Sequence, residues 1–268
     1  MKNQKAASFR ASAAKVLNIL LPVLFGVIFI VIWETGGLHS LMNLKKYQLP
    51  VPSQIANTFG DNLPKLLKNG RFTVTEALWG LVIGSAIGFI TAVLATLFPK
   101  WGYGGLTALS AFNAVPIVAL SPVMNNWFGM GMGSKIAVVV VTTMAAMAFN
   151  AYRGLNDLKP FSLDLMKSYA SDKKTIFLKL RLPNCLPNIL TALKISTTSS
   201  MIAAIVSEFF ASYAGIGFEL SNALKTAKMP LAWAYIALAA IIGIAMYLLV
   251  SLVERFAIKW HASQKNKN

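Results

Sequence analysis

The chain has 268 residues, of which 56% are hydrophobic and only 13% charged, and its formal net charge is +16. Soluble domains carry about 25% charged residues, so this composition excludes an ordinary soluble domain and is typical of a membrane protein. The basic residues lie at the ends of apolar runs and do not alternate with aromatic residues on one face. This distribution favours membrane topology over nucleic-acid binding as the reason for the charge.

Six apolar runs are each long enough to cross a hydrocarbon core of about 30 Å. They lie near residues 16–34, 72–98, 104–127, 134–153, 184–210 and 231–257. The runs predict an all-α polytopic membrane protein with about six transmembrane helices. We expect a cytoplasmic segment at 1–15, a transmembrane domain at 16–257 and a cytoplasmic tail at 258–268.

The basic residues also predict the orientation of the chain. Six spans put both termini on one side, and that side would hold sixteen basic residues against eight on the other. Basic residues are enriched on the cytoplasmic side, so we expect a cytoplasmic N-terminus and a cytoplasmic loop at 154–183. Lys68, Arg71 and Lys135 then fall on the outer side, and no arginine lies inside a predicted span to mark a path for anions.

The second run carries Gly80, Gly84 and Gly88, a small-residue pattern that lets another helix approach closely. Helix packing is the expected role of these glycines. Glu76 lies only five residues into the run, so we expect it at the membrane interface.

Helix breakers and amides interrupt the third run at Asn113, Pro116, Pro122, Asn125 and Asn126. Lipid would penalise them, so they should face protein or water. Two interpretations stay open: the residues line a translocation path and let the span bend, or the helix is kinked and its amides bond to neighbours. Asn113 and Pro116 are candidates for the path, whereas the second interpretation is favoured for Asn125 and Asn126.

Residues 162–182 form a charged amphipathic segment between two apolar runs. Ser162 is suited to cap a helix, with Asp164 in its first turn, and Ser171 and Asp172 indicate a second start. The pattern predicts two short helices that meet near Ala170. An apolar stripe at helical spacing is expected from Leu163, Met166, Ala170, Ile176, Phe177 and Leu180.

Glu208 lies near the outer end of the fifth run. An ionisable residue at such a position is a functional hypothesis by default, here a gate or pathway role, although it could simply end the helix in water. The loop that follows, SYAGIGFELSNALKTAKMP, is expected outside the cell, where it is a candidate docking surface for a binding protein.

The segment at 162–182 resembles the EAA loop of the membrane subunits of binding-protein-dependent ABC importers. Counting back from Leu182 and Pro183 places Asp164, Leu165 and Met166 on its Glu-Ala-Ala and Ala170 on its Gly. Further similarity lies in KLRLPNCLPNILTALKI at 179–195, NAVPIVALSPVMNNWFGMGMGSK at 113–135, SEFF at 207–210 and LVERFAIKWH at 252–261. These stretches resemble the nitrate, sulfonate and taurine branch, whose relatives include permeases for thiamine precursors and riboflavin.

The resemblance implies a type I ABC importer permease in the bacterial inner membrane. It implies a homodimer in lipid that works with two ATP-binding subunits and an extracytoplasmic solute-binding protein. The residues expected to couple to the ATPase are Asp164, Leu165, Met166, Ser168, Ala170, Leu182 and Pro183. ATP and Mg would bind to the ATPase, and no cofactor or nucleic acid to this chain.

Catalytic signatures are missing from the sequence. GMGMGSK at 129–135 has the wrong spacing for a phosphate loop, and His39 and His261 are too few and too far apart for a metal site. We therefore expect no enzymatic activity and no metal. The alternative function is an ion-coupled secondary transporter or channel without an ATPase, which would require buried acidic pairs and internal repeats. A purely structural subunit would leave the interrupted third run unexplained.

Overall fold

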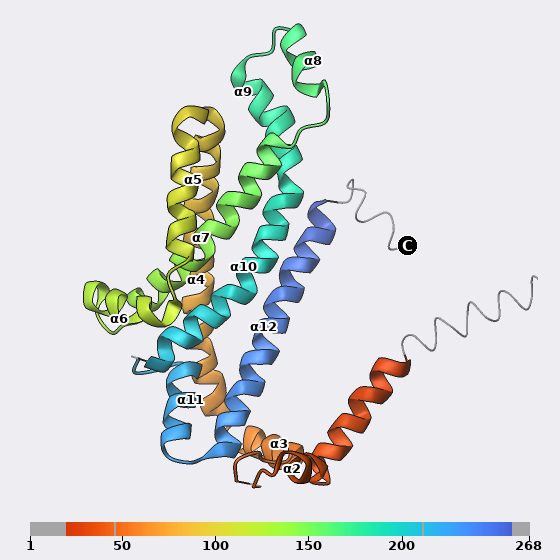
Figure 1. Cartoon of the computed structure of the whole chain (residues 1–268), viewed down its shortest axis with the longest axis vertical. Helices are drawn as coiled ribbons and strands as arrows, with labels where there is room; N and C mark the ends of the chain where they lie inside the picture. The colour runs from red at the N-terminus through yellow and green to blue at the C-terminus, as the bar shows by residue number, and fades with distance from the viewer. Residues whose placement is uncertain (1–19, 46, 211, 259–268) are drawn as a thin grey trace, which may run out of the picture.

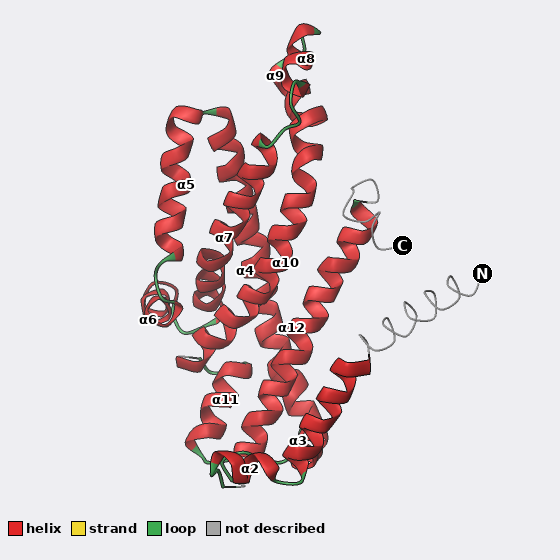
Figure 2. Cartoon of the chain, turned by 45° about the vertical axis from the view of Figure 1, so that its right-hand side comes forward, coloured by secondary structure: helices red, strands yellow, loops and turns green. Residues whose placement is uncertain are grey.

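The computed structural model describes residues 20–45, 47–210 and 212–258, and this part of the chain is helical without strands (Figures 1 and 2). An apolar helix over Leu20–Glu34 opens it. The further elements are α2 (Gly37–Met42), α3 (Pro52–Asp61), α4 (Leu63–Leu97), α5 (Pro99–Asn113), α6 (Ile117–Phe128), α7 (Met132–Asn156), α8 (Ser162–Ser168), α9 (Lys173–Ile176), a π-helical turn (Phe177–Arg181), α10 (Leu182–Phe210), α11 (Ile216–Lys225) and α12 (Met229–Ala257).

Four helical segments in the described part are long and apolar enough to span a membrane: α4, α7, α9 continued through α10, and α12. They confirm four of the six predicted spans. The first predicted span begins before the described residues. The segment 1–15 and most of the tail lie outside them. The third run is not one straight span, because Gly104–Phe112 and Ile117–Phe128 are bent by 97°. The bend lies at Ala114 to Pro116, where proline cannot donate a backbone hydrogen bond.

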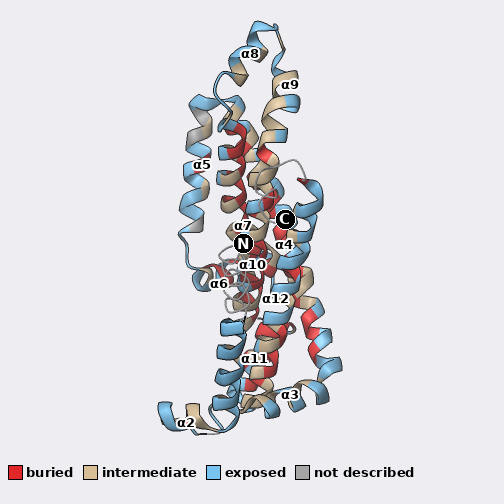
Figure 3. Cartoon of the chain, turned by 90° about the vertical axis from the view of Figure 1, so that its right-hand side faces the viewer, coloured by how far each residue is buried: buried red, intermediate tan, exposed pale blue. Residues whose placement is uncertain are grey.

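The centre of the bundle is α7, which packs on α4 and on α10. The predicted glycine stripe of α4 faces α7: a Cβ at Gly84 would lie 2.1 Å from Thr143 Oγ1, and one at Gly80 would lie 2.3 Å from Val139 Cβ. Only glycine permits this approach, so the expected packing role is confirmed. Figure 3 shows the buried residues gathered on these central helices.

An exposed side of the bundle is formed by α12, of which few residues are buried. Its exposed side chains are apolar, among them Ile241, Ile244 and Leu248. Lys194 of α10 forms an ion pair with Glu254 of α12 near the end of that helix. This pair neutralises two charges where α10 and α12 meet.

The two ends of the bundle differ in shape (Figure 1). At one end α2, α3 and α11 close the bundle. At the other end α8 and α9 project beyond the long helices as a hairpin, and neither helix contains a buried residue. Most side chains of α8 are therefore exposed in the described chain.

Candidate functional site

The projecting hairpin, residues 161–181, has short helices because its backbone turns sharply at both ends of α8. Phe161 (φ 63°) and Ala170 (φ 50°) adopt left-handed conformations, which β-carbon contacts normally disfavour. The predicted break near Ala170 is therefore confirmed. Ser162 does not cap α8, because its hydroxyl donates to the carbonyl of Lys159 instead (2.6 Å). Asp172 does cap α9, accepting from the backbone N of Thr175 (3.3 Å).

An aromatic and apolar face of the hairpin is exposed. Phe161, Leu165 and Tyr169 follow one another at a spacing of four residues, so they lie on one side of α8. Their exposed fractions are 82%, 58% and 77%. Leu163 and Met166, from the stripe named in the sequence analysis, are half-buried. The sequence analysis assigned Leu165 to this surface and missed Phe161 and Tyr169, whose spacing from Leu165 was the available signal.

The remaining predicted coupling residues lie around this face. Asp164 and Ala170 are exposed, and Asp164 is 3.9 Å from Lys167 in an exposed ion pair. The Ser168 hydroxyl donates to the carbonyl of Leu165 (2.8 Å), which helps to close the last turn of α8. Leu182 and Pro183 lie apart from α8, at the start of α10, where the helix continues without a break from α9 through the π-helical turn.

Hydrogen bonds join the base of the hairpin to the end of α7. Arg181 donates to the carbonyl of Leu155 and to Asn156 Oδ1, both at 2.8 Å. Asn184 Nδ2 donates to the carbonyls of Gly154 (2.8 Å) and Asp157 (2.9 Å). The two long helices that carry the hairpin are thus connected where they leave the bundle.

A buried polar cluster lies deeper in the bundle, where α4, α10 and α11 meet. Glu208 is completely buried, and its carboxylate accepts from Thr73 Oγ1 (2.7 and 3.0 Å) and from the backbone N of Gly217 (2.7 Å). The backbone N of Ile216 donates to Thr73 Oγ1 (2.9 Å), and that of Gly215 to Asn69 Oδ1 (3.1 Å). These bonds hold the start of α11 against α4 and α10.

The glycines of this loop allow the backbone to reach the carboxylate. A Cβ on Gly215, whose φ is 103°, would lie 2.1 Å from Glu208 Oε1. A Cβ on Gly217 would lie 2.1 Å from the carbonyl oxygen of Ile205. Gly215 and Gly217 are therefore the sequence signal for this contact, which the sequence analysis did not interpret.

Two further charged residues belong to the cluster. Glu76 is buried one turn after Thr73 and is within hydrogen-bonding reach of Glu208, while its Oε2 has no partner in the described chain. Lys135 of α7 is buried and donates to Asn125 Oδ1 (2.9 Å) and to the carbonyl of Met130 (3.0 Å). Both side chains are enclosed by the bundle, which the sequence analysis did not anticipate when it placed Glu76 at the membrane interface and Lys135 on the outer side.

The predicted pathway residues are not brought together. Glu208 lies in the buried cluster, and Pro116 directly precedes α6 and is exposed. Asn113 ends α5, and its side chain lies outside the described residues. Asn125 bonds to Lys135, as the second interpretation of the third run expected. No group of three or more His, Cys, Asp or Glu side chains suited to a metal occurs in the part of the chain that is described.

The long apolar helices, the bent pair and the projecting hairpin together define the fold of a type I ABC importer permease. An amino acid ABC transporter chain matches with a TM-score of 0.60 at 17% identity, covering 73% of this chain and 95% of that one. A chain of the MetNI methionine ABC transporter matches with a TM-score of 0.58 at 15% identity, covering 72% and 94%. These neighbours confirm the predicted fold class.

Sequence comparison gives the family. The family model described as "Binding-protein-dependent transport system inner membrane component" matches residues 84–260. The chain belongs to this family and is a transmembrane permease subunit of an ABC importer.

A probable ABC transporter permease protein of Haemophilus influenzae is 27% identical, over 90% of this chain and 98% of that protein. The formylaminopyrimidine transport permease protein ThiX of Halalkalibacterium halodurans is 28% identical, over 91% and 96%. The riboflavin transport system permease protein RibX of Chloroflexus aurantiacus is 26% identical, over 88% of each chain.

Proposed function

We propose that the hairpin of α8 and α9 docks on a cytoplasmic ATP-binding subunit. The observation that carries this proposal is the exposed face of Phe161, Leu165 and Tyr169 on α8, a helix without a buried residue. Apolar patches that lie beyond the membrane-spanning helices cost free energy when they are exposed to water, and they are typical of protein interfaces. The orientation follows from it: the hairpin end is cytoplasmic, and the end with α3 and α11 is outside.

The connection at the hairpin base explains how motion would reach the spans. Arg181 and Asn184 fix the hairpin to the end of α7, and α10 continues from α9 as one helix. A movement of the ATPase pair would then be transmitted to α7 and α10 as rigid elements, which is the basis of alternating access. ATP and Mg bind to the ATPase in this scheme, and this chain hydrolyses nothing.

The assembly that fits this scheme is a homodimer of the chain with two ATPases and an external solute-binding protein. Relatives carry names that specify formylaminopyrimidine, riboflavin, aliphatic sulfonates and taurine. We propose a small solute from this range as cargo. The buried acidic pair of Glu76 and Glu208 would suit the alternative of an ion-coupled transporter, but membership of the ABC permease family argues against that alternative.

Co-purification of the ATPase tests the docking proposal. The permease is expressed with its cognate ATPase subunit, and the yield of ATPase and the solute-stimulated ATP hydrolysis are measured. Replacing Phe161 and Tyr169 together with Ser should abolish both, whereas Phe25→Ser, an equally exposed aromatic in the first apolar helix, should leave ATPase capture intact. Full capture and hydrolysis by the hairpin double variant would refute the docking role.

A further inference from the structure

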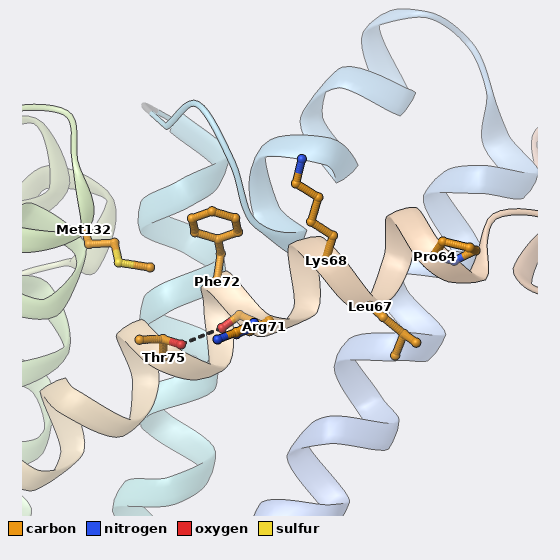
Figure 4. A pocket seen from close by; sticks show the side chains of 7 residues that line it. All are labelled: Pro64, Leu67, Lys68, Arg71, Phe72, Thr75 and Met132. Carbon is orange, nitrogen blue, oxygen red and sulfur yellow. Dashed lines mark hydrogen bonds between the residues drawn. The ribbon is translucent and has the colours of Figure 1, made fainter.

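A wide pocket opens beside the first turns of α4, at the end of the bundle away from the hairpin. Its volume is about 720 Å³, and residues of α4 form its wall together with Met132 of α7. Figure 4 shows Lys68 and Phe72 pointing from α4 in the same direction, with Met132 facing them across the gap. Arg71 and Thr75 complete this side of the wall.

The two cations of the pocket have no carboxylate partner. The three ion pairs among the described residues are Lys65 with Glu219, Lys167 with Asp164, and Lys194 with Glu254. Lys65 precedes Lys68 by one turn on the same helix and is neutralised by Glu219 at 2.7 Å. Lys68 and Arg71 of α4 are therefore positive charges without an ion-pair partner among the described residues.

The turn of α4 that carries these cations packs against α12. Asn69 donates to the Tyr235 hydroxyl (3.4 Å), and a Cβ on Gly70 would lie 3.3 Å from Leu238 and 3.2 Å from Ile242. Leu238 is nine residues into α12, which at 1.5 Å per residue is about 14 Å from its start. No charged residue occurs in α12 before Glu254, so this turn of α4 lies level with an apolar stretch of α12.

These contacts bear on the interpretation of Arg71 and Lys68. The sequence analysis placed both outside the spans and found no arginine to mark an anion path. The contacts of Asn69 and Gly70 with α12 instead place this turn of α4 beside the apolar part of a predicted span. Both cations are exposed and face the open pocket, where they have no carboxylate partner among the described residues.

We propose that the pocket binds the anionic oxyacid group of a small solute in transit, such as a carboxylate, sulfonate or phosphate. Arg71 presents a planar fork that suits two oxygens of one such group, and Lys68 adds a second positive charge. Phe72 and Met132 would contact the apolar part of the solute. The inference rests on the proposed transport function and specifies its cargo class as anionic.

Binding of p-toluenesulfonate tests the pocket, with p-toluenesulfonamide as the neutral analogue of the same shape. Calorimetry is done on the permease and ATPase complex in phosphatidylcholine nanodiscs. We expect saturable sulfonate binding that weakens with salt, and none by the sulfonamide. In Lys68→Gln with Arg71→Gln the affinity should fall at least about tenfold, the equivalent of losing one charge-assisted hydrogen bond.

Lys45→Gln is the matched control, because Lys45 is exposed and does not line the pocket. Its affinity should equal that of the wild type. Thr75 bonds to the backbone carbonyl of Arg71 and not to its side chain, so the double variant keeps this bond. Failure of the wild type to bind the sulfonate, equal affinity in the double variant, or equally tight sulfonamide binding would each overturn the proposal.

A lipid head group could supply the same chemistry. Repeating the titration in nanodiscs of the anionic lipid phosphatidylglycerol separates the two sources. Sulfonate binding by the wild type that persists there supports a solute site. Sulfonate binding that disappears there would show that the lipid head group occupies Lys68 and Arg71, and would overturn the solute assignment. ATPase capture is measured in the same samples. A complex that captures and couples its ATPase but binds no sulfonate defeats only this inference, whereas loss of capture defeats the proposed function.

Discussion

Thr73 of α4 and Glu208 of α10 are joined by a hydrogen bond of 2.7 Å inside the bundle, at a site that water does not reach. The same Thr73 oxygen accepts from Ile216, and the same carboxylate accepts from Gly217. Each side chain therefore serves two partners, so that α11 is fixed to both long helices through one small network. Networks of this kind are costly when one member is removed.

Glu208→Gln is expected to weaken this network. An amide offers one acceptor oxygen where the carboxylate offers two, so at least one of the contacts that Thr73 and Gly217 make with the two oxygens is lost. A buried group left unpaired costs about 1–3 kcal/mol. Thermal unfolding of the purified complex should show a lower midpoint, and solute uptake should fall.

Thr73→Val distinguishes a structural role of Glu208 from a role in the pathway. It removes the same hydrogen bond but leaves the carboxylate in place. If Glu208 acts by holding α11, both variants will lose stability and uptake together. Unchanged uptake in Glu208→Gln would remove Glu208 from the candidate pathway residues.

Gly217→Ala should prevent the close approach of α11. The added methyl group would lie 2.1 Å from the carbonyl oxygen of Ile205, and backbone atoms cannot yield to it without moving the helix. We expect a strong loss of folded protein in membranes, measured by size-exclusion chromatography. Gly60→Ala in α3 is the control, because nothing lies within 4 Å of its Cβ position. That control should be neutral or stabilise by up to about 1 kcal/mol.

The spans were predictable from the sequence because a long apolar run in lipid has few alternatives to a helix. The glycine stripe of α4 was predictable for a similar reason, since spacing alone brings small residues onto one face. The burial of Glu76 and Lys135 was not predictable. Each lies near the end of an apolar run, and whether its side chain is buried depends on how the neighbouring helices pack around it. Glu76 and Thr73 are three residues apart and so lie on the same side of α4. That this side contacts Glu208 of α10 could be seen only in the folded structure.

The candidate coupling surface was predictable in location but only partly in composition. The charged segment between two apolar runs indicated a hairpin outside the membrane. The outward face was left unassigned, because helical periodicity alone does not say which of two apolar stripes turns inward. Phe161 has a left-handed backbone conformation directly before α8. A non-glycine residue in that conformation has no clear sequence signature.

Arg181→Met is expected to separate docking from coupling. The exposed face of α8 remains, so the ATPase should still be captured. The bonds from Arg181 to Leu155 and Asn156 are lost, and each charge-assisted bond of this kind contributes about 1.5 kcal/mol, roughly tenfold in an equilibrium. Uptake per ATP hydrolysed should therefore fall. An unchanged ratio of uptake to hydrolysis would show that the connection to α7 carries no coupling.

Substitutions at Ala170 test the turn that shapes the docking face. Ala170 adopts φ 50°, where a side chain costs about 1–2 kcal/mol, so Ala170→Gly should relieve strain and preserve coupled uptake. Ala170→Val adds a branched carbon in the same conformation and should displace α8, leaving the bundle assembled but transport uncoupled from ATP hydrolysis. Because Ala170 is exposed, neither change should alter the chromatographic profile of the permease itself. Wild-type ATPase yield, hydrolysis and uptake in the Val variant would contradict a role for this turn in coupling.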